Sequence, residues 1–375
     1  MHLRQPRMFS VLACAVASHP IPFDERRGIG SGGGKMFGML WRWLLGFVVA
    51  LTALSVLTLG THAAPQAAPP ANTWVNVTGT LANKPSECGT ITLLSPVPRS
   101  DTIIAGVAGK GLWANNRGST WVQLGESDKI LNRPLWIVYD PAHPGVFWES
   151  GIYGSAGVYQ TKDRGNTFRR LGSIFHNDYV SVDLRDPERA TLLAGGHEQG
   201  QTVYQSTDGG QTWTNIGLTL PAKGASTNPL VIDSNTYLVN AEGVGIYRTT
   251  NGGTSWRRVS GQGPSGPPLV TANGTIYWPA NGGLLKSTDA GTTWAQVGTD
   301  IRPVHPIELS DGKLVSVGTT RLVISADGGS TWTAFGAPLP FTPAGLIYAP
   351  GRRGFFIWRS DCQQTVPSDA VMAIY

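Results

Sequence analysis

Charged side chains are scarce in this sequence. Only 14% of the 375 residues are Asp, Glu, Lys or Arg, and the formal net charge is +5. Residues 1–63 hold six of the basic and two of the acidic residues, which leaves 23 basic against 22 acidic residues in the rest of the chain. Because no overall basic field remains to attract polyanions, we expect no nucleic-acid partner.

Motifs for metal, nucleophile and phosphate chemistry are also lacking. The seven histidines occur without the spacing of metal ligands. No Gly-x-Ser-x-Gly nucleophile elbow or phosphate-binding loop stands in a suitable context, and the many Gly-Gly pairs are typical of turns. We therefore expect neither a metal ion nor a cofactor.

A long apolar run occurs only near the N-terminus. The uncharged run 44–59 follows a basic flank and precedes the small residues Ala63 and Ala64, which is the layout of a secretory signal. Its sixteen residues fall short of the roughly 20 that a spanning helix needs. Cleavage after Ala63 or Ala64 is therefore favoured over an uncleaved membrane anchor, and we predict export to the periplasm or the extracellular space.

Three regions precede the main domain in this interpretation. Residues 1–35 have no period and fit no targeting pattern, so we interpret them as sequence upstream of the true start codon. Residues 36–64 are the signal peptide or anchor, and residues 65–72 are an Ala/Pro-rich linker.

Cysteine is rare. Cys14 falls in the doubtful region 1–35, which leaves Cys88 and Cys362 in the exported part. Two cysteines in an oxidising compartment predict one disulfide. The alternative is a pair of buried free thiols.

Glycine, proline and tryptophan are abundant, with 48, 26 and 13 residues, which indicates a turn-rich all-β protein. Six segments align without gaps on the pattern Ser/Thr-x-Asp-x-Gly-x-Thr-Trp, and we name them box segments. They are ANNRGSTW (114–121), TKDRGNTF (161–168), STDGGQTW (206–213), TTNGGTSW (249–256), STDAGTTW (287–294) and SADGGSTW (325–332).

Each part of a box segment suits the turn of a β-hairpin. The Asp or Asn side chain can accept hydrogen bonds from backbone N–H groups of the turn, the Gly accepts a positive φ, and the aromatic ring is buried. A short apolar stretch precedes each box, and an aromatic-x-x-aliphatic pattern follows it. We therefore predict a structural role for Asn116, Asp163, Asp208, Asn251, Asp289 and Asp327.

The aromatic residues that end consecutive boxes lie 38 to 47 residues apart, which suits the four short strands of a propeller blade. Residues 73–77 repeat the strand after a box with no box in front, and residues 371–375 resemble the strand before a box. Each end supplies what the other lacks. We predict a seven-bladed β-propeller over residues 73–375, with the N-terminal strand completing the last blade and the two cysteines in neighbouring blades.

The boxes resemble the Asp-box, or bacterial neuraminidase repeat, of sialidases, xyloglucanases, sortilin-type receptors and the photosystem II stability and assembly factor. The resemblance covers about residues 73–375 and indicates fold rather than activity. It implies that the binding face lies opposite the boxes, on the loops that enter each first strand and leave each second strand. The candidate binding residues there are Arg133, Tyr153, Asp178, His197, Arg302, Arg321 and Arg359, with His176, His305 and Asp361 beside them.

A sialidase-like hydrolase would need three arginines, a Tyr–Glu pair and an acid/base Asp. The family's early Phe/Tyr-Arg-Ile-Pro motif is matched only by Ile301-Arg302-Pro303, which is late and out of order. We expect Glu149, Glu198 and Glu242 at comparable loop positions of consecutive blades, where two of them could form the catalytic pair of a glycoside hydrolase.

The single-propeller length, the export signal and the regular boxes look most like photosystem assembly-factor-like proteins. The sequence therefore predicts a monomeric, non-enzymatic module that binds a protein partner in the cell envelope, with membrane contact only through an uncleaved N-terminal segment. The alternatives are an exo-acting, sialidase-like glycoside hydrolase and a propeller that binds a glycan.

Overall fold

The computed structural model describes residues 72–125 and 130–375, all within one unit, Pro65–Tyr375. The predictions for residues 1–35, 36–64 and 65–71 lie outside the described residues. The described part contains strands and two short 3₁₀ helices, η1 (Gly79–Leu81) and η2 (Pro350–Arg352). No helix in this part has the length and apolar character needed to cross a bilayer.

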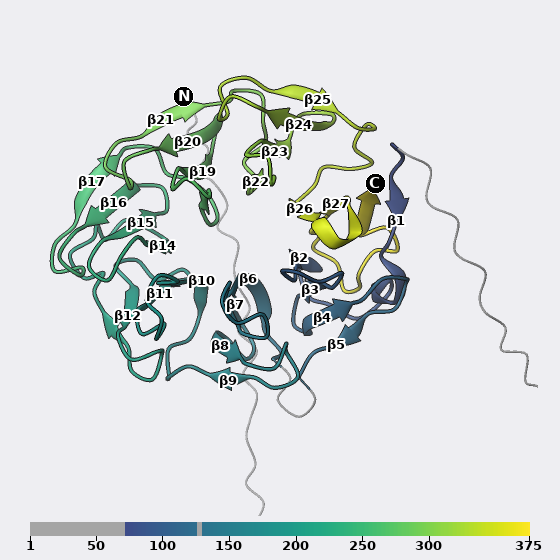
Figure 1. Ribbon diagram of the computed structural model, residues 1–375. Helices are drawn as coiled ribbons and strands as arrows, with labels where there is room; N and C mark the ends of the chain where they lie inside the picture. The colour runs from purple at the N-terminus through teal and green to yellow at the C-terminus, as the bar shows by residue number, and fades with distance from the viewer. Residues whose placement is uncertain (1–71, 126–129) are drawn as a thin grey trace, which may run out of the picture. The chain divides into compact units, whose positions relative to one another are not determined.

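Seven four-stranded antiparallel sheets follow one another around a central axis (Figure 1), and the predicted seven-bladed propeller is confirmed. In blades 1 to 6, four consecutive strands run from the axis outward. Blades 1 to 3 contain β2 (Ile91–Pro96), β3 (Ile103–Val107), β4 (Gly111–Asn115) and β5 (Val122–Gln123); β6 (Arg133–Tyr139), β7 (Phe147–Ile152), β8 (Gly157–Thr161) and β9 (Arg169–Arg170); and β10 (Asn177–Val182), β11 (Leu192–Gly196), β12 (Val203–Ser206) and β13 (Thr214–Asn215).

The next three blades repeat this order. They contain β14 (Thr227–Val231), β15 (Tyr237–Ala241), β16 (Gly245–Thr249) and β17 (Arg257–Ser260); β18 (Leu269–Val270), β19 (Ile276–Ala280), β20 (Gly283–Ser287) and β21 (Ala295–Val297); and β22 (Ile307–Glu308), β23 (Leu314–Val317), β24 (Leu322–Ser325) and β25 (Thr333–Phe335).

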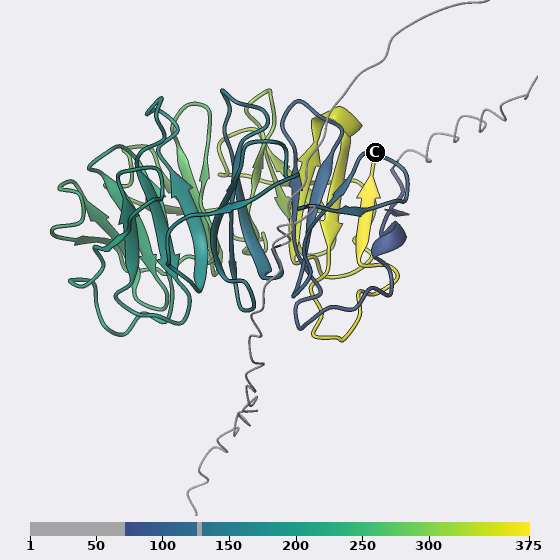
Figure 2. The ribbon, with the colours of Figure 1, turned by 90° about the horizontal axis from the view of Figure 1, so that it is seen from below.

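Burial decreases from the second strand of a blade to its outermost strand. Every residue of β3, β11, β15 and β19 is buried, because each of these strands is covered on both faces by neighbouring blades. The outermost strands β9 and β13 have two residues each, and these are exposed or half-buried. Figure 2 shows the blades from the side, with the short outer strands at the rim.

The seventh blade joins the two ends of the propeller. Its strands are β26 (Gly345–Ala349), β27 (Gly354–Trp358), β28 (Val371–Ile374) and, from the N-terminal side, β1 (Val75–Asn76). The sheet order is β1-β28-β27-β26, and Val75 pairs with Ala373. The predicted closure is therefore confirmed, and in Figure 1 the strand β1 lies beside the C-terminus.

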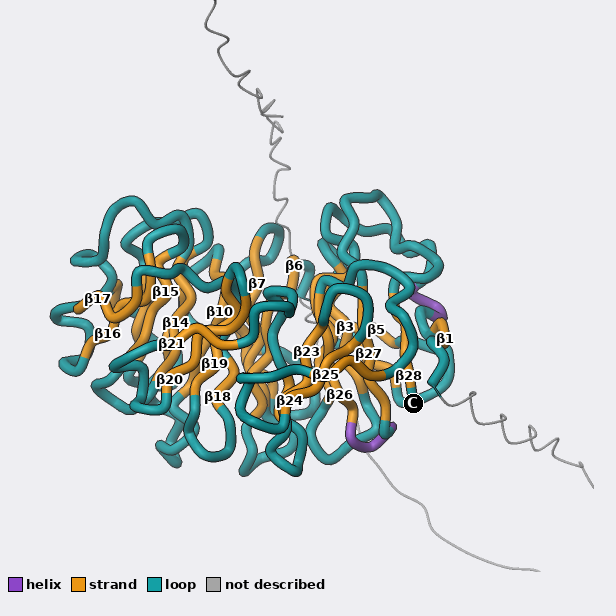
Figure 3. Tube along the Cα trace, turned by 90° about the horizontal axis from the view of Figure 1, so that it is seen from above, coloured by secondary structure: helices purple, strands orange, loops and turns teal. Residues whose placement is uncertain are grey.

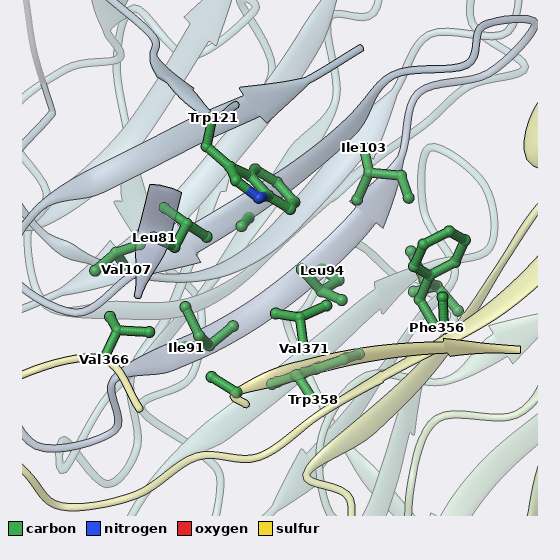
Figure 4. Packing of buried hydrophobic residues seen from close by; sticks show 14 of the residues in the cluster. Leu81, Ile91, Leu94, Ile103, Val107, Trp121, Phe356, Trp358, Val366 and Val371 are labelled. Carbon is green, nitrogen blue, oxygen red and sulfur yellow. The ribbon is translucent and has the colours of Figure 1, made fainter. Parts of the chain in front are cut away.

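The hydrophobic core is divided into seven clusters, one between each pair of neighbouring blades. Figure 4 shows the cluster between blades 1 and 7, where Ile91 and Trp121 of blade 1 pack with Phe356 and Val371 of blade 7. The aromatic ring that ends each box lies in the interface with the preceding blade. Burying a large apolar side chain contributes roughly 1.5–3 kcal/mol, so these rings hold the blades together as well as ending the turns.

Cys88 and Cys362 form a disulfide between the first and last blades. Beside it, segment 83–89 pairs with segment 361–366 through backbone hydrogen bonds, including Asn83 N to Val366 O at 2.8 Å and Gly89 N to Asp361 O at 2.9 Å. We name this disulfide and its flanking ladder the seam. The ring is thus closed twice, by β1 on β28 and by the seam.

Candidate functional site

The loops gather at two opposite faces of the strand layer. The box face carries the turns between first and second strands and between third and fourth strands, and it includes η2 at the lower edge of Figure 3. The loop face carries the loops that precede each first strand and follow each second strand, and it includes η1, which lies at the right of that view just above β1.

The turns of the box face use their polar groups internally. In segment 206–213, the Ser206 hydroxyl donates to Oδ1 of Asp208 at 2.8 Å and accepts from Gly210 N at 2.8 Å. The Asp208 carboxylate accepts from Thr212 N at 2.9 Å and from the Thr212 hydroxyl at 2.6 Å. These bonds, led by the Thr212 hydroxyl, lower the pKa of Asp208 to about 2. The corresponding backbone bond is made by Asp163, Asn251, Asp289 and Asp327.

The first box differs from its gapless alignment. Asn115, and not Asn116, folds back over this turn: its Oδ1 accepts from Arg117 N at 3.1 Å, and its Nδ2 donates to Thr120 O at 2.6 Å. The reason is a turn one residue shorter than in the other boxes, because Asn115 is the last residue of β4, as Thr161 is of β8. Asn116 instead accepts a bond from the Thr102 hydroxyl.

Three predicted loop-face residues form a hydrogen-bonded chain across blades 2 and 3. Asp178 lies in β10, His197 follows β11, and Tyr153 follows β7. His197 Nδ1 is 2.8 Å from Oδ1 of Asp178, and His197 Nε2 is 3.2 Å from the Tyr153 hydroxyl. Both bonds are satisfied by the neutral tautomer with its proton on Nδ1, which donates to Asp178 while Nε2 accepts from the phenol.

The chain runs from a buried acid to an exposed phenol. The side chain of Asp178 is 8% exposed and that of His197 is 18% exposed, whereas Tyr153 is 40% exposed. Burial raises the pKa of Asp178, and the neighbouring His197 opposes that shift. The arrangement positions the Tyr153 hydroxyl at the surface with its orientation set by groups beneath it.

Two further side chains and an unusual backbone surround this chain. The His176 ring lies 4.9 Å from His197 and 5.0 Å from Tyr153 between centroids, and Glu198 Oε1 lies 3.8 Å from His197 Nε2. Tyr153, His176 and Glu198 have φ values of 57°, 61° and 52°. Positive φ is uncommon outside glycine, and such conformations concentrate at functional sites.

Exposed apolar side chains occur on the same face. Leu131, Tyr153, Phe175 and Leu218 are 45%, 40%, 59% and 68% exposed, and all four lie on loops of the loop face between blades 1 and 4. We name them the apolar arc. They are four of the seven large hydrophobic residues exposed in the described part of the chain, so the exposure is concentrated rather than scattered.

Sequence reasoning found Tyr153 but missed the other three members of the apolar arc. The available signal was a large apolar residue in a short Gly- and Ser-containing connection between two strands, as at Phe175 in GSIFHN.

The three predicted glutamates do not occupy comparable positions. Glu198 and Glu242 lie on loops after second strands, whereas Glu149 lies inside β7, paired with Ile137 and Tyr159, and is fully buried. The expected loop position of Glu149 is therefore wrong. Burial raises the pKa of Glu149 to about 8 although an Asn132 amide donates to its Oε1 at 2.9 Å, so the group is a neutral acid at pH 7.

Two of the predicted binding arginines are used to hold loops in place. Arg302 donates to the carbonyl oxygens of Gly318 and Thr319, each at 3.3 Å. Arg321 donates to the carbonyl oxygen of Gly336. Their donors are thus directed toward the backbone of the same blade.

The other two arginines lie near the seam. Arg359 pairs with Asp361 at 3.1 Å and with Asp369. Arg133 packs its guanidinium against Gly89, where a Cβ atom would lie 2.6 Å from the Arg133 nitrogen. None of the four arginines therefore joins the chain of Asp178, His197 and Tyr153. Over residues 72–125 and 130–375, no three His, Cys, Asp or Glu side chains converge in the manner of metal ligands.

One family model matches the chain, that of the DUF6242 beta propeller domain, over residues 224–347. The match covers about one third of the chain. No curated protein sequence matches.

Solved structures show the same fold. The GH74 xyloglucanase from Xanthomonas campestris is 19% identical, with a TM-score of 0.51, and the match covers 81% of this chain and 55% of the enzyme. YCF48 bound to D1 peptide is 17% identical, with a TM-score of 0.52, and the match covers 81% and 97%. YCF48 from Cyanidioschyzon merolae is 14% identical, with a TM-score of 0.50, and the match covers 80% and 98%. The chain thus matches about half the length of the xyloglucanase and nearly all of YCF48.

Proposed function

We propose that this protein is an exported, non-enzymatic Asp-box propeller that binds a protein partner through the apolar arc. The observation that carries the proposal is the exposure of Leu131, Tyr153, Phe175 and Leu218 on loops of one face, the face that also carries the hydrogen-bonded chain. Exposed apolar side chains on the same face as placed polar groups are typical of protein interfaces, in which a few aromatic anchors supply most of the binding energy.

Tyr153 is the anchor in this proposal. It combines an exposed ring with a hydroxyl that His197 holds in place, so little side-chain freedom is lost when a partner covers it. A buried Asp178 beneath His197 keeps the imidazole in one orientation.

Three observations support the wider assignment. The box turns have the hydrogen bonding that the Asp-box resemblance implies, and the disulfide suits an oxidising compartment outside the cytosol. The structure of YCF48 was solved with D1 peptide bound, and almost the whole length of YCF48 matches this chain.

The test is affinity capture from the envelope fraction with the immobilised full-length chain, followed by binding measurements with each recovered partner. Phe175→Ser and Leu218→Ser should each weaken binding by about tenfold, the effect of removing an exposed apolar side chain that the partner would cover. Val122→Ser is the matched control, because Val122 is 62% exposed on the outer strand β5 and lies outside the arc. Equal loss of binding in the control, or full binding by both arc variants, would contradict the proposal.

A glycoside hydrolase remains the alternative from the sequence. That chemistry needs two carboxyl groups flanking one sugar. Glu149 is enclosed between strands, so the accessible pair would be Glu198 and Glu242. Turnover of aryl glycosides or polysaccharides by the purified protein, lost in Glu198→Gln and retained in Glu149→Gln, would replace the binding proposal with this one.

A further inference from the structure

Three rings meet inside the central channel. Trp136 comes from β6 of blade 2, Tyr179 from β10 of blade 3, and His305 from the segment just before β22 of blade 6. The ring centroids of Trp136 and His305 are 5.2 Å apart, and those of Trp136 and Tyr179 are 6.2 Å apart. Blades 2 and 6 are not neighbours, and β6 and β22 face each other across the axis in Figure 1, so this contact spans the channel. We name the three rings the aromatic bridge.

Proline-rich segments bring His305 to the bridge. Segments 264–268 and 303–306 contain five prolines between them and enter the channel ahead of the first strands of blades 5 and 6. The first segment is held by the Trp278 indole N–H, which donates to Gly266 O at 2.8 Å. Proline restricts the backbone, so these segments present a preformed wall rather than a loose loop.

Two cavities meet at the aromatic bridge, with volumes of about 480 and 620 Å³. All three rings line both cavities, as do Pro267 and Leu269. The larger cavity is otherwise lined mostly by Val, Leu, Ile and Pro side chains. Both volumes lie in the range of small-molecule sites, which are largely apolar with a few placed polar groups.

The polar groups of the bridge are neutral. Trp136 and Tyr179, which carry an indole N–H and a hydroxyl, both line space that a ligand can enter. Burial lowers the pKa of His305 to about 4 and raises the pKa of Tyr179, so at pH 7 neither carries charge.

The charged side chains that line these cavities already have partners. Asp183 pairs with Arg185 at 3.3 Å, and Glu308 accepts from Ala272 N at 2.8 Å. Because the three rings themselves are uncharged, a charged ligand that packs against them would lose its hydration without gaining a counter-charge from the bridge.

We propose that the channel is a binding site for a small, uncharged aromatic molecule with one hydrogen-bond acceptor. Its ring packs against Trp136, and its acceptor receives a hydrogen bond from the Trp136 indole or the Tyr179 hydroxyl. This site is separate from the apolar arc on the loop face, and it does not depend on the proposed protein partner.

The test uses prodan, an uncharged naphthalene ketone whose emission shifts to the blue in apolar surroundings, with the full-length chain. A ligand of about 17 non-hydrogen atoms at roughly −0.3 kcal/mol per atom gives a Kd on the order of 0.1 mM or tighter. We expect saturable one-to-one binding with blue-shifted emission. Absence of saturable binding to the folded wild-type chain would overturn the proposal.

Variants locate the bound probe. Tyr179→Phe should weaken binding by about three- to tenfold, the usual effect of one lost hydrogen bond, whereas Tyr204→Phe on β12 is the matched control. Leu269→Trp adds a bulky ring at a position that lines both cavities and should abolish binding beside the bridge, provided that its circular dichroism and melting show a folded chain. Binding that survives Leu269→Trp, or that is lost in Phe175→Ala on the apolar arc, would place the probe elsewhere and refute the channel site.

Discussion

Removing the Cys88–Cys362 disulfide should lower the stability of the propeller without opening the folded ring. The bond joins residues 274 positions apart. For a loop of this length the chain-entropy relation gives about 5–6 kcal/mol at 25 °C, whereas native disulfides typically contribute about 2–4 kcal/mol. In the folded state the ring stays closed without the bond, because β1 pairs with β28 and the backbone ladder of the seam remains. The stabilisation therefore acts mainly through the unfolded chain.

The assay compares the wild-type chain with Cys88→Ser, Cys362→Ser and the double variant in urea and thermal unfolding, each with and without reductant. We expect a loss of about 2–5 kcal/mol and a fall in Tm of roughly 5–10 °C. Each single variant should equal the double variant, because either change removes the same bond. Reductant should lower the stability of the wild-type chain, because both cysteines are exposed and the bond is accessible. It should leave the variants unchanged, because they lack the bond.

Two results would refute this reasoning. Equal midpoints for the oxidised and reduced wild-type chain, with reduction verified by mass after alkylation, would show that the bond does not restrict the unfolded chain. A double variant that loses the far-ultraviolet spectrum of the folded state would show that the non-covalent closure cannot hold the ring.

Substitutions at three other positions test the core and the turns. The pKa of Glu149 is raised to about 8 in the folded chain, so between pH 4.5 and 8 the folded chain holds a proton that the unfolded chain has lost. The unfolding free energy should therefore fall by up to about 1.4 kcal/mol for each unit that the pH rises in this range, and Glu149→Gln should flatten that dependence in urea titrations. Asp208→Ala should lower Tm more than Asp208→Asn, because Asn keeps an acceptor for Thr212 N. The wild type should lose more stability than either variant between about pH 4 and pH 2, because only the wild type has Asp208, with its pKa of about 2, to protonate. Trp74→Ala should cost about 2–3 kcal/mol in urea unfolding, less than a fully buried Trp, because Trp74 packs partly buried in the cluster between blades 6 and 7.

The blade count was predictable because it depends on local signals that recur. Each box marks one hairpin, and the unmatched strand at Trp74 required a partner at the C-terminus. The error at the first box arose from length, since a gapless alignment cannot show that the turn after Asn115 is one residue shorter. Ser150 and Gly151, which follow Glu149, are residue types common in turns but lie within β7, and the end of that strand was placed too early.

The site was less predictable than the fold because it depends on packing between blades. Asp178, His197 and Tyr153 were each named from the sequence, but their chain exists only because blades 2 and 3 pack at one particular register. A loop arginine has the same appearance in sequence whether it binds a ligand or, as Arg321 does, a backbone carbonyl. The contact of Trp136 with His305 had no local signal, because it joins blades that are not neighbours.

The difference between the two faces explains where recognition can vary. On the box face, the Asp208 carboxylate already accepts four kinds of internal donor, from Ser206, Gln211 and the N–H and hydroxyl of Thr212, so a partner there would compete with the turn itself. On the loop face, the members of the apolar arc are exposed and belong to none of the seven interblade clusters. Under the proposed function, substitutions in the arc can therefore change partner binding without weakening the packing that holds the ring, whereas substitutions in the boxes cannot.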